Sequence, residues 1–377
     1  KDHPSVVLTA QRWDRLFEAM EENLDKVISQ SPAWQQDGRY QELQVHVRSL
    51  YKVLKKRNAL QLYNSVGHDQ LPVVWGDKTP RDVLTTEVWE KAAGLSMSSL
   101  DSSLWCNPPV AMTMALAAAS LLQAIFSGGT TLIWAITLTV MGLTMFLDSL
   151  FLKGNLLLAL SLDLFTPYRY KGALERVVHH EAGHFLNAYL LGSPIEGVSV
   201  NPWRSLENER FAKQDLITGV VHYDSVIGTD WSNKNRYNKS MDRQSIIFMS
   251  GIAAEALVYG SCNEAAGDED NLIGLYIGDA KDSREIRNQA RWAVLQAVLL
   301  LKHYKVCYDS LVKTMTQNEN CTVGDCILAI EKAARQHKLG PIEPRTLEII
   351  MAGNRDKEEG TDLLHWNLQQ NQTASTL

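Results

Sequence analysis

The stretch ALERVVHHEAGHFLNAYLLG, residues 173–192, decides the fold of the region around it. Its apolar residues recur every three to four positions, which is the period of an amphipathic helix. Within it, the pentapeptide HEAGH at 180–184 fits the pattern H-E-x-x-H. The sequence therefore predicts a helix that carries two histidines and a glutamate in an apolar setting.

The spacing of these polar residues predicts a metal centre. Residues four apart lie on the same face of a helix, so His180 and His184 can bind one metal ion. Glu181 would then take a proton from a metal-activated water and later pass it to the leaving amine. His179 is expected to point away, and Gly183, a poor helix former, predicts close approach of another backbone. This pattern is typical of a zinc-dependent (Zn2+) peptidase.

The third ligand is not fixed by this pattern. A catalytic zinc usually has three protein ligands and one open position for water. Two acidic groups compete for the third place, Glu255 in SGIAAEALVYG and the run Asp268-Glu269-Asp270. The residues alone leave this choice open.

Composition excludes some classes of function. A net charge of -6 and a pI of about 6.0 provide no basic surface for nucleic acid. The five cysteines are scattered, which is unlike a disulfide framework and favours a reducing compartment. Cys321 and Cys326 have no second pair at ligand spacing, so we interpret them as buried thiols.

The segment before the histidine motif divides into two parts. Residues 1–107 are predicted to be an N-terminal helical segment, with two or three amphipathic helices in 9–65 and another over 81–104. Residues 108–152 contain two uncharged apolar runs, 110–126 and 132–147. Each is just long enough to cross a hydrocarbon layer of about 30 Å, which predicts a transmembrane hairpin. A pair of buried core helices is the alternative.

The charges around the apolar runs predict their orientation. Lys and Arg residues flank both runs, whereas the loop between them has none. The positive-inside bias then places both ends of the hairpin on the cytosolic, stromal or matrix-like side of the membrane.

Three longer stretches together resemble a known family. The stretch LERVVHHEAGHFLNAYLLGSPIEGVSVNP at 174–202 resembles the peptidase core of the FtsH-type zinc metalloproteases. The segment GVVHYDS at 219–225 is similar to the next strand of that family. The segment SGIAAEALVYGSCNEAAGDEDNL at 250–272 resembles its glycine-alanine-glutamate helix and the loop that bears the aspartate ligand.

The resemblance implies roles for individual residues. His180 and His184 become zinc ligands and Glu181 the general base. In the family an aspartate directly precedes a leucine, but here Asn271 holds that place, so we choose Asp270 as third ligand, with Asp268 as the fallback. Glu255 is then expected to orient a ligand histidine.

The chain also departs from the family, because it contains no G-x-x-x-x-G-K-[ST] sequence for binding ATP. It therefore resembles the stand-alone FtsH-like membrane proteins of plastids and cyanobacteria. That implies an ATP-independent endopeptidase that cleaves membrane or membrane-adjacent proteins and can join a homo- or hetero-oligomer with membrane proteins. The implied location is a chloroplast membrane, thylakoid or envelope, with the soluble domain in the stroma. The alternative is an inactive FtsH-like scaffold or assembly subunit.

The expected fold class is mainly α (α+β), a helical zinc-peptidase domain at 167–354 with a short β element. A strand pair is predicted at 197–200 and 219–223, with a charged rim between them at 203–215. Helices are predicted over 241–259 and 282–304, and residues 355–377 are predicted to be a disordered tail.

Overall fold

The computed structural model describes most of the chain outside the apolar hairpin region and the C-terminal tail. The residues described are 10–30, 38–71, 73–74, 84–100, 167–200, 220–224, 234–262, 266–276, 283–318, 320–342 and 345–346. The predicted hairpin at 108–152, the rim at 203–215 and the tail at 355–377 lie outside them. Among the helices that are described, none combines the length and the apolar character needed to cross a membrane.

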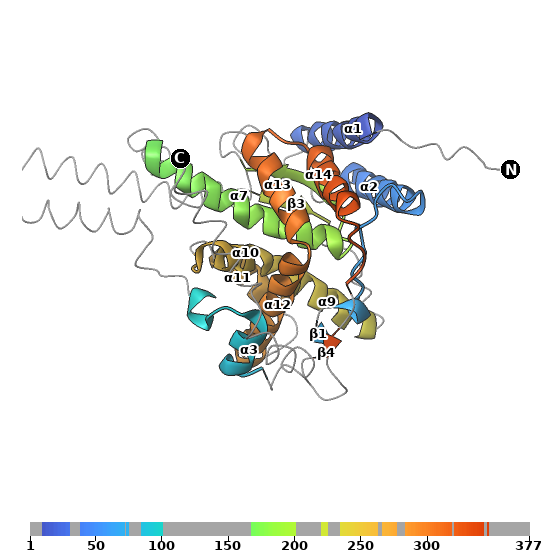
Figure 1. Cartoon of the computed structure of the whole chain (residues 1–377). Coiled ribbons are helices and arrows are strands. Elements are labelled where there is room, and N and C mark those ends of the chain that lie inside the picture. The colour runs from blue at the N-terminus through green and yellow to red at the C-terminus, as the bar shows by residue number, and fades with distance from the viewer. Residues whose placement is uncertain are drawn as a thin grey trace, which may run out of the picture.

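The fold is mainly helical and is organised around helix α7, Pro167–Leu190. In Figure 1, α7 crosses the molecule between two groups of helices, and it packs directly on α10 (Ser250–Tyr259) and α13 (Lys305–Gln317). The histidine motif therefore lies on the central helix. The other elements are α1 (Ala10–Ser29), α2 (Gly38–Lys56), α3 (Thr86–Ala93), α9 (Lys234–Phe248), α11 (Ala266–Tyr276), α12 (Ser283–His303), α14 (Val323–Gln336), and the short 3-10 helices η2 (His68–Gln70) and η4 (Met97–Leu100).

Two strands confirm the predicted β element. Strand β2 (Ile195–Ser199) pairs antiparallel with β3 (Val220–Tyr223), with a bulge after Ile195. A second ladder is minimal, because β1 (Val73–Val74) and β4 (Arg345–Thr346) pair in parallel over two residues. The mainly α expectation with a short β element is thus confirmed.

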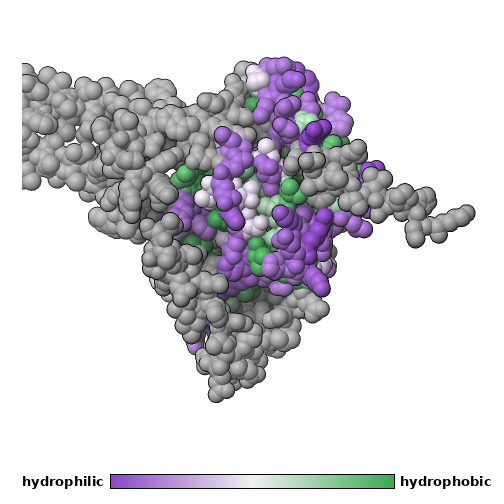
Figure 2. All heavy atoms as spheres, turned by 45° about the horizontal axis from the view of Figure 1, so that its top comes forward, coloured by the Kyte–Doolittle hydropathy of each residue, from purple (hydrophilic) through white to green (hydrophobic). Residues whose placement is uncertain are grey.

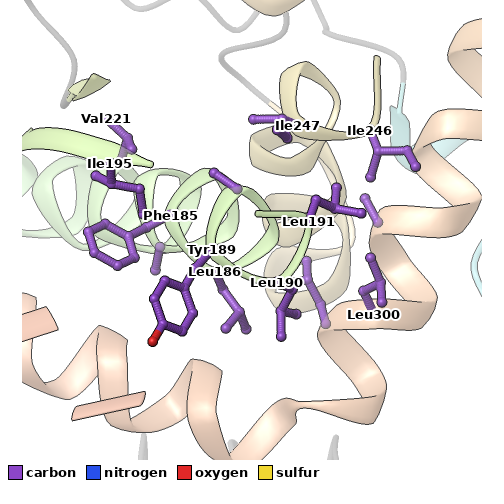
Figure 3. Close-up of a cluster of buried hydrophobic side chains, with 14 of the residues drawn as sticks. Phe185, Leu186, Tyr189, Leu190, Leu191, Ile195, Val221, Ile246, Ile247 and Leu300 are labelled. Carbon is purple, nitrogen blue, oxygen red and sulfur yellow. The ribbon is translucent and has the colours of Figure 1, made fainter. Parts of the chain in front are cut away.

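The core surrounds the second half of α7. Figure 3 shows side chains of α7 pointing to several sides, toward the strands, α9 and α12. Such a helix is buried all round, which explains why its sequence has a weaker polar face than a surface helix. The labelled members of this cluster are Phe185, Leu186, Tyr189, Leu190, Leu191, Ile195, Val221, Ile246, Ile247 and Leu300.

Helix α7 ends in a turn that only glycine accommodates. Gly192 has a φ of 81°, and a Cβ built on it would lie 2.4 Å from Asn64 Oδ1. The N–H of Ser193 donates to the carbonyl of Ala188, as in a Schellman cap. The turn sends the chain directly into β2, so the strand pair is placed close to the histidine motif.

The N-terminal helices belong to the same core. Residues of α1 and α2, including Phe17 and Tyr51, are buried in one continuous hydrophobic cluster with α7. Polar contacts reinforce this packing, since Tyr40 donates to Glu196 Oε2 at 2.7 Å and Arg48 pairs with Asp224. Helix α2 therefore holds both strands of the pair from one side.

Two helix predictions and one loop prediction need correction. Within 84–100, the described part of the helix predicted over 81–104, the α-helix is confined to α3, because Thr85 caps its start and Gly94, at a φ of 63°, ends it; the 3-10 helix η4 follows. The helix predicted over 241–259 is interrupted at Met249, which divides it into α9 and α10. The loop expected to bear the aspartate ligand is instead helix α11, Ala266–Tyr276.

The prediction for α12 and for the cysteine pair is confirmed. Trp292 and most of the apolar face of α12 are buried in the core. Cys321 and Cys326 are buried with their sulfur atoms 3.7 Å apart, on either side of the Thr322 cap of α14. These are the positions of a hydrophobic staple, so the two thiols have a packing role at the start of α14.

The described part of the face seen in Figure 2 is mostly polar. Hydrophilic residues dominate the described part of the face seen in Figure 2, and hydrophobic residues form small separate spots among them. Scattered apolar residues of this kind are normal on a folded domain.

Candidate metal centre

The two histidines of the motif face each other across one turn of α7. Their ring centroids are 4.8 Å apart, and His180 Nε2 lies 3.0 Å from His184 Nε2. Both residues are more than nine-tenths buried. The helical spacing thus brings two potential ligand atoms together, as the sequence predicts.

Asp268 completes the group and corrects the choice of Asp270. Asp268 Oδ2 lies 3.3 Å from His180 Nε2, and Asp268 Oδ1 lies 3.3 Å from His184 Nε2. Asp270 is exposed to solvent. Because α11 is a helix, residues two apart point to nearly opposite sides, so Asp268 and Asp270 cannot both face the histidines. His180, His184 and Asp268 are the described residues that can hold a metal ion together.

The outer nitrogen of each ring fixes its tautomer. His184 Nδ1 lies 2.8 Å from the carbonyl oxygen of Ile247, and His180 Nδ1 lies 2.8 Å from Glu255 Oε1. Both partners can only accept, so each Nδ1 carries its proton and donates. In the neutral rings, each Nε2 is then an unprotonated acceptor directed at the other ligand atoms. This is the arrangement that commonly orients metal-binding histidines.

Three acceptors that converge in a buried space require a cation. Asp268 Oδ2 is buried without a hydrogen bond from any part of the chain that the structure describes. The two Nε2 atoms are 3.0 Å apart, and each lies 3.3 Å from a different oxygen of Asp268. With one ligand atom taken from each residue, the three atoms lie within 4.8 Å of one another. Tetrahedral zinc with bonds of about 2.0 Å separates its ligand atoms by roughly 3.3 Å. The residues present therefore fit a zinc ion in chemistry, and with Oδ2 as the ligand atom of Asp268 two of the three separations are close to this value.

The pKa values of His180, His184 and Asp268 also indicate that this group favours a positive charge. Burial alone would lower the pKa of His180 and of His184, but the carboxylate of Asp268 raises both, that of His180 well above its usual value. Burial would raise the pKa of Asp268, yet the two histidines hold it at about 2. The site attracts positive charge strongly, and in the absence of a metal a proton satisfies that demand.

Glu255 supports His180 from behind. It is fully buried in α10, where it accepts from His180 through Oε1 and from Arg176 through Oε2 at 3.0 Å. Arg176 also donates to the carbonyl of Ser261 at 3.0 Å. Sequence reasoning gave Glu255 this orienting role but missed Arg176. A signal was present, since Arg176 precedes His180 by one helical turn on the same face of α7.

Glu181 lies beside the metal group rather than in it. The side chain is almost fully buried, and burial raises its pKa against the opposing effects of His184 and His180. The backbone N–H of Val221 in β3 donates a hydrogen bond to its carboxylate. Glu181 is therefore close to the two histidines and to the strand pair at once.

Two glycines allow the helices to approach this closely. A Cβ on Gly183 would lie 2.5 Å from the carbonyl oxygen of Ser250, and one on Gly251 would lie 2.2 Å from His180 Nε2. The expected close backbone approach at Gly183 is confirmed. A side chain at Gly251 would occupy the place of a His180 ring atom.

His179 points away from the metal group, as predicted. Its Nδ1 lies 2.9 Å from the hydroxyl of Tyr308, and its ring packs edge-on against Tyr259. Burial lowers its pKa to about 4, so the ring is neutral near pH 7. His179 is a packing residue between α7 and α13.

Comparison of the chain with protein-family models, with curated proteins and with solved structures found no match. The function of the chain is therefore inferred from the geometry of its own residues.

Proposed function

We propose that this chain is a membrane-anchored, ATP-independent zinc metalloendopeptidase. The observation that carries the proposal is the convergence of His180, His184 and Asp268, with buried Glu181 beside them. Three protein ligands leave one position of a tetrahedral zinc open, which is the composition of a catalytic rather than a structural site.

The chain's own residues divide the work of hydrolysis. When bound, zinc would act as a Lewis acid that makes water a better nucleophile near pH 7. Glu181 accepts the proton that the attacking water loses and then delivers it to the leaving amine nitrogen. A carboxylate with a raised pKa suits both transfers, because it accepts a proton readily and still releases it. Glu255 and Arg176 keep His180 in its ligand orientation.

The strand pair supports an extended peptide as substrate. An extended peptide can add to a free strand edge through main-chain hydrogen bonds. Tyr51 occupies the outer edge of β2, since its hydroxyl donates to the carbonyl of Ile195 at 2.8 Å and accepts from the Ile195 N–H at 3.2 Å. On the outer edge of β3, the backbone N–H of Val221 points at the carboxylate of Glu181. A peptide added to β3 would lie beside the metal group.

The lack of an ATP-binding motif limits the substrates. Without a motor the enzyme would cleave exposed or already unfolded segments of membrane or membrane-adjacent proteins, unless a partner supplies unfolding. The apolar runs at 110–126 and 132–147 support attachment to a lipid bilayer. By resemblance, the membrane is that of a chloroplast, with the peptidase domain on the stromal side.

The alternative is an inactive scaffold subunit in a membrane complex. Asn271 favours that alternative, because it stands before Leu272 in the place where the resembled family has its aspartate ligand. The position of Asp268 supports the enzyme instead, since it places a carboxylate beside both histidines. A scaffold also has no need of a buried glutamate at position 181.

The test is zinc content and proteolysis of the detergent-purified full chain. We expect one zinc per chain and degradation of casein, with Glu181→Gln retaining zinc and losing proteolysis by about 10²–10⁴-fold. Asp270→Asn is the control and should keep both properties. Protein that holds no zinc and cleaves nothing in any form would refute the enzyme and leave the scaffold.

A further inference from the structure

The hydroxyl of Tyr223, on strand β3, is buried without a hydrogen bond among the residues that the structure describes. Its oxygen is inaccessible to solvent and has no partner among the described residues, although the residue as a whole is partly exposed. Burying a hydroxyl without a partner lowers stability. Such a group in a folded protein therefore calls for an explanation, and a role with a bound ligand is one.

The register of β3 shows which of its peptide groups face its outer edge. The backbones of His222 and Asp224 turn toward β2, where His222 pairs with Gly197 and the Asp224 N–H donates to Pro194 O at 2.9 Å. Alternate residues turn the other way, so the peptide groups of Val221 and Tyr223 face the outer edge. This is the edge at which Val221 contacts Glu181.

The surroundings of the ring connect Tyr223 to the ligands. Its centroid is 6.4 Å from that of Phe248, the residue after Ile247, whose carbonyl holds His184. Burial raises the pKa of the phenol well above its usual value, and the negative charge of Asp268 adds to the rise. The hydroxyl is therefore a neutral, protonated donor at the pH of catalysis, within the field of the metal group.

We propose that the Tyr223 hydroxyl is a catalytic hydrogen-bond donor to the oxyanion of the peptide carbonyl during hydrolysis. The inference rests on the proposed function. The oxygen of water attacks the carbonyl carbon, the π electron pair moves to the carbonyl oxygen, and Glu181 takes the proton. Tyr223 donates a hydrogen bond to that oxygen and keeps its own proton. The electron pair then returns, the C–N bond breaks, and the amine leaves with the proton from Glu181. A fixed donor at this position is a common means of stabilising the transition state.

A second tyrosine provides a matched control. The Tyr259 hydroxyl is likewise buried without a partner among the residues described. Its ring lies under the Arg176 guanidinium at 4.2 Å, and its charged neighbours are Glu175, Arg176 and Glu255 rather than Asp268. Replacing Tyr259 by Phe thus removes the same atom in a different place.

The experiment compares Tyr223→Phe and Tyr259→Phe with the zinc-loaded wild-type full chain. For Tyr223→Phe we expect kcat to fall about 10²–10³-fold, as when one oxyanion donor is removed. KM and zinc content should stay unchanged. The melting temperature should stay level or rise, because no hydrogen bond is lost. Tyr259→Phe should keep kcat. A phosphinic peptide, whose oxygens resemble the tetrahedral intermediate, should bind Tyr223→Phe at least about tenfold more weakly, measured by calorimetry.

Other results separate the inference from the function on which it rests. If Tyr223→Phe keeps kcat while Glu181→Gln is inactive, the role of Tyr223 is refuted and the peptidase stands. If Tyr223→Phe loses zinc or melts lower in step with its loss of activity, the hydroxyl is structural and the inference is refuted. A wild-type chain that neither cleaves peptides nor binds the phosphinic peptide overturns both.

Discussion

Two buried carboxylates of this molecule stand in opposite surroundings. Glu331 in α14 is 1% exposed and accepts from the backbone N–H groups of Gln61 and Leu62 and from the hydroxyl of Tyr189, all within 2.8 Å. Asp268 is 9% exposed, and its oxygens face the acceptor nitrogens of two histidines. The hydrogen-bonding capacity of a buried carboxylate surrounded by donors is satisfied by the protein itself. A buried carboxylate surrounded by acceptors requires a cation.

This difference teaches how to distinguish a structural carboxylate from a functional one. Burial is common to both, so it does not discriminate. The direction of the neighbouring hydrogen bonds does, because Glu331 joins the N-terminal segment, α7 and α14 through donors supplied by the protein itself. Oδ2 of Asp268 has no such donor among the residues described.

The largest expected effect is on folding, at Glu331. Glu331→Ala leaves two backbone N–H groups and the Tyr189 hydroxyl buried without a partner. Each costs about 1–3 kcal/mol, so we expect the free energy of unfolding to fall by more than about 3 kcal/mol. Urea denaturation measures this, and zinc per folded molecule should not change. A Glu331→Ala variant as stable as the wild type would contradict the structural role of Glu331 on which the comparison with Asp268 depends.

The next effect is on metal binding, at Asp268. With zinc at about 100 times its Kd, the wild type should gain about 2.7 kcal/mol of stability. Asp268→Asn should gain none, and its metal-free form should be less stable than the metal-free wild type below pH 6.5, because the carboxylate no longer pairs with the protonated histidines. Asp270→Asn, the same change two residues away on α11, should respond to zinc like the wild type. Thermal melts with and without zinc test all three proteins.

Glu255 should have a smaller effect of the same kind. Glu255→Gln weakens the acceptor that orients His180, and the loss of such a partner reduces metal affinity by about 10–100-fold. Competition with a chelator of known affinity measures this change. An unchanged zinc affinity would mean that Glu255 and Arg176 only pack α10 against α7.

The smallest expected effect is the pH dependence of the stability of the metal-free protein. In metal-free protein the pKa of His180 is raised above 6.5, so its protonated form adds stability that is complete below pH 6.5 and lost as pH rises through the folded pKa. Asp268 contributes stability above pH 3.8 that is lost as pH falls through about 2. We therefore expect the metal-free melting temperature to fall above pH 6.5. The increase caused by zinc should grow over the same range, because the ligands must lose protons. In Asp268→Asn the fall should be much smaller.

The sequence predicted those parts of the site that depend on local periodicity. His180, Glu181 and His184 follow from the helical spacing of one segment, and the strand pair is expected from the resemblance of two nearby segments to the FtsH-type peptidase core. Both are governed by contacts close in the chain, which is why pattern reasoning reached them.

The remaining parts depend on where separate elements meet. The choice between Asp268 and Asp270 requires knowing that α11 starts at Ala266, since that fixes which side chain faces α7. The position of Tyr223 depends on the bulge after Ile195, which sets the register of β3. Neither fact can be deduced from the periodicity of apolar residues in a single segment. The family pattern places its aspartate at position 271, and Asp270 is chosen as the carboxylate one place earlier, whereas the phase of α11 directs Asp268 toward the histidines.

The hydrogen bonds between Tyr51 and Ile195 have a consequence for solubility. An unpaired strand edge is a template on which another chain can pair, and proteins commonly protect such edges against aggregation. At Ile195 the phenol occupies both the N–H and the carbonyl that a neighbouring chain would need. Copies of this protein crowded on a surface would therefore be hindered from joining through β2, and the protection requires only one side chain from a helix that already packs there.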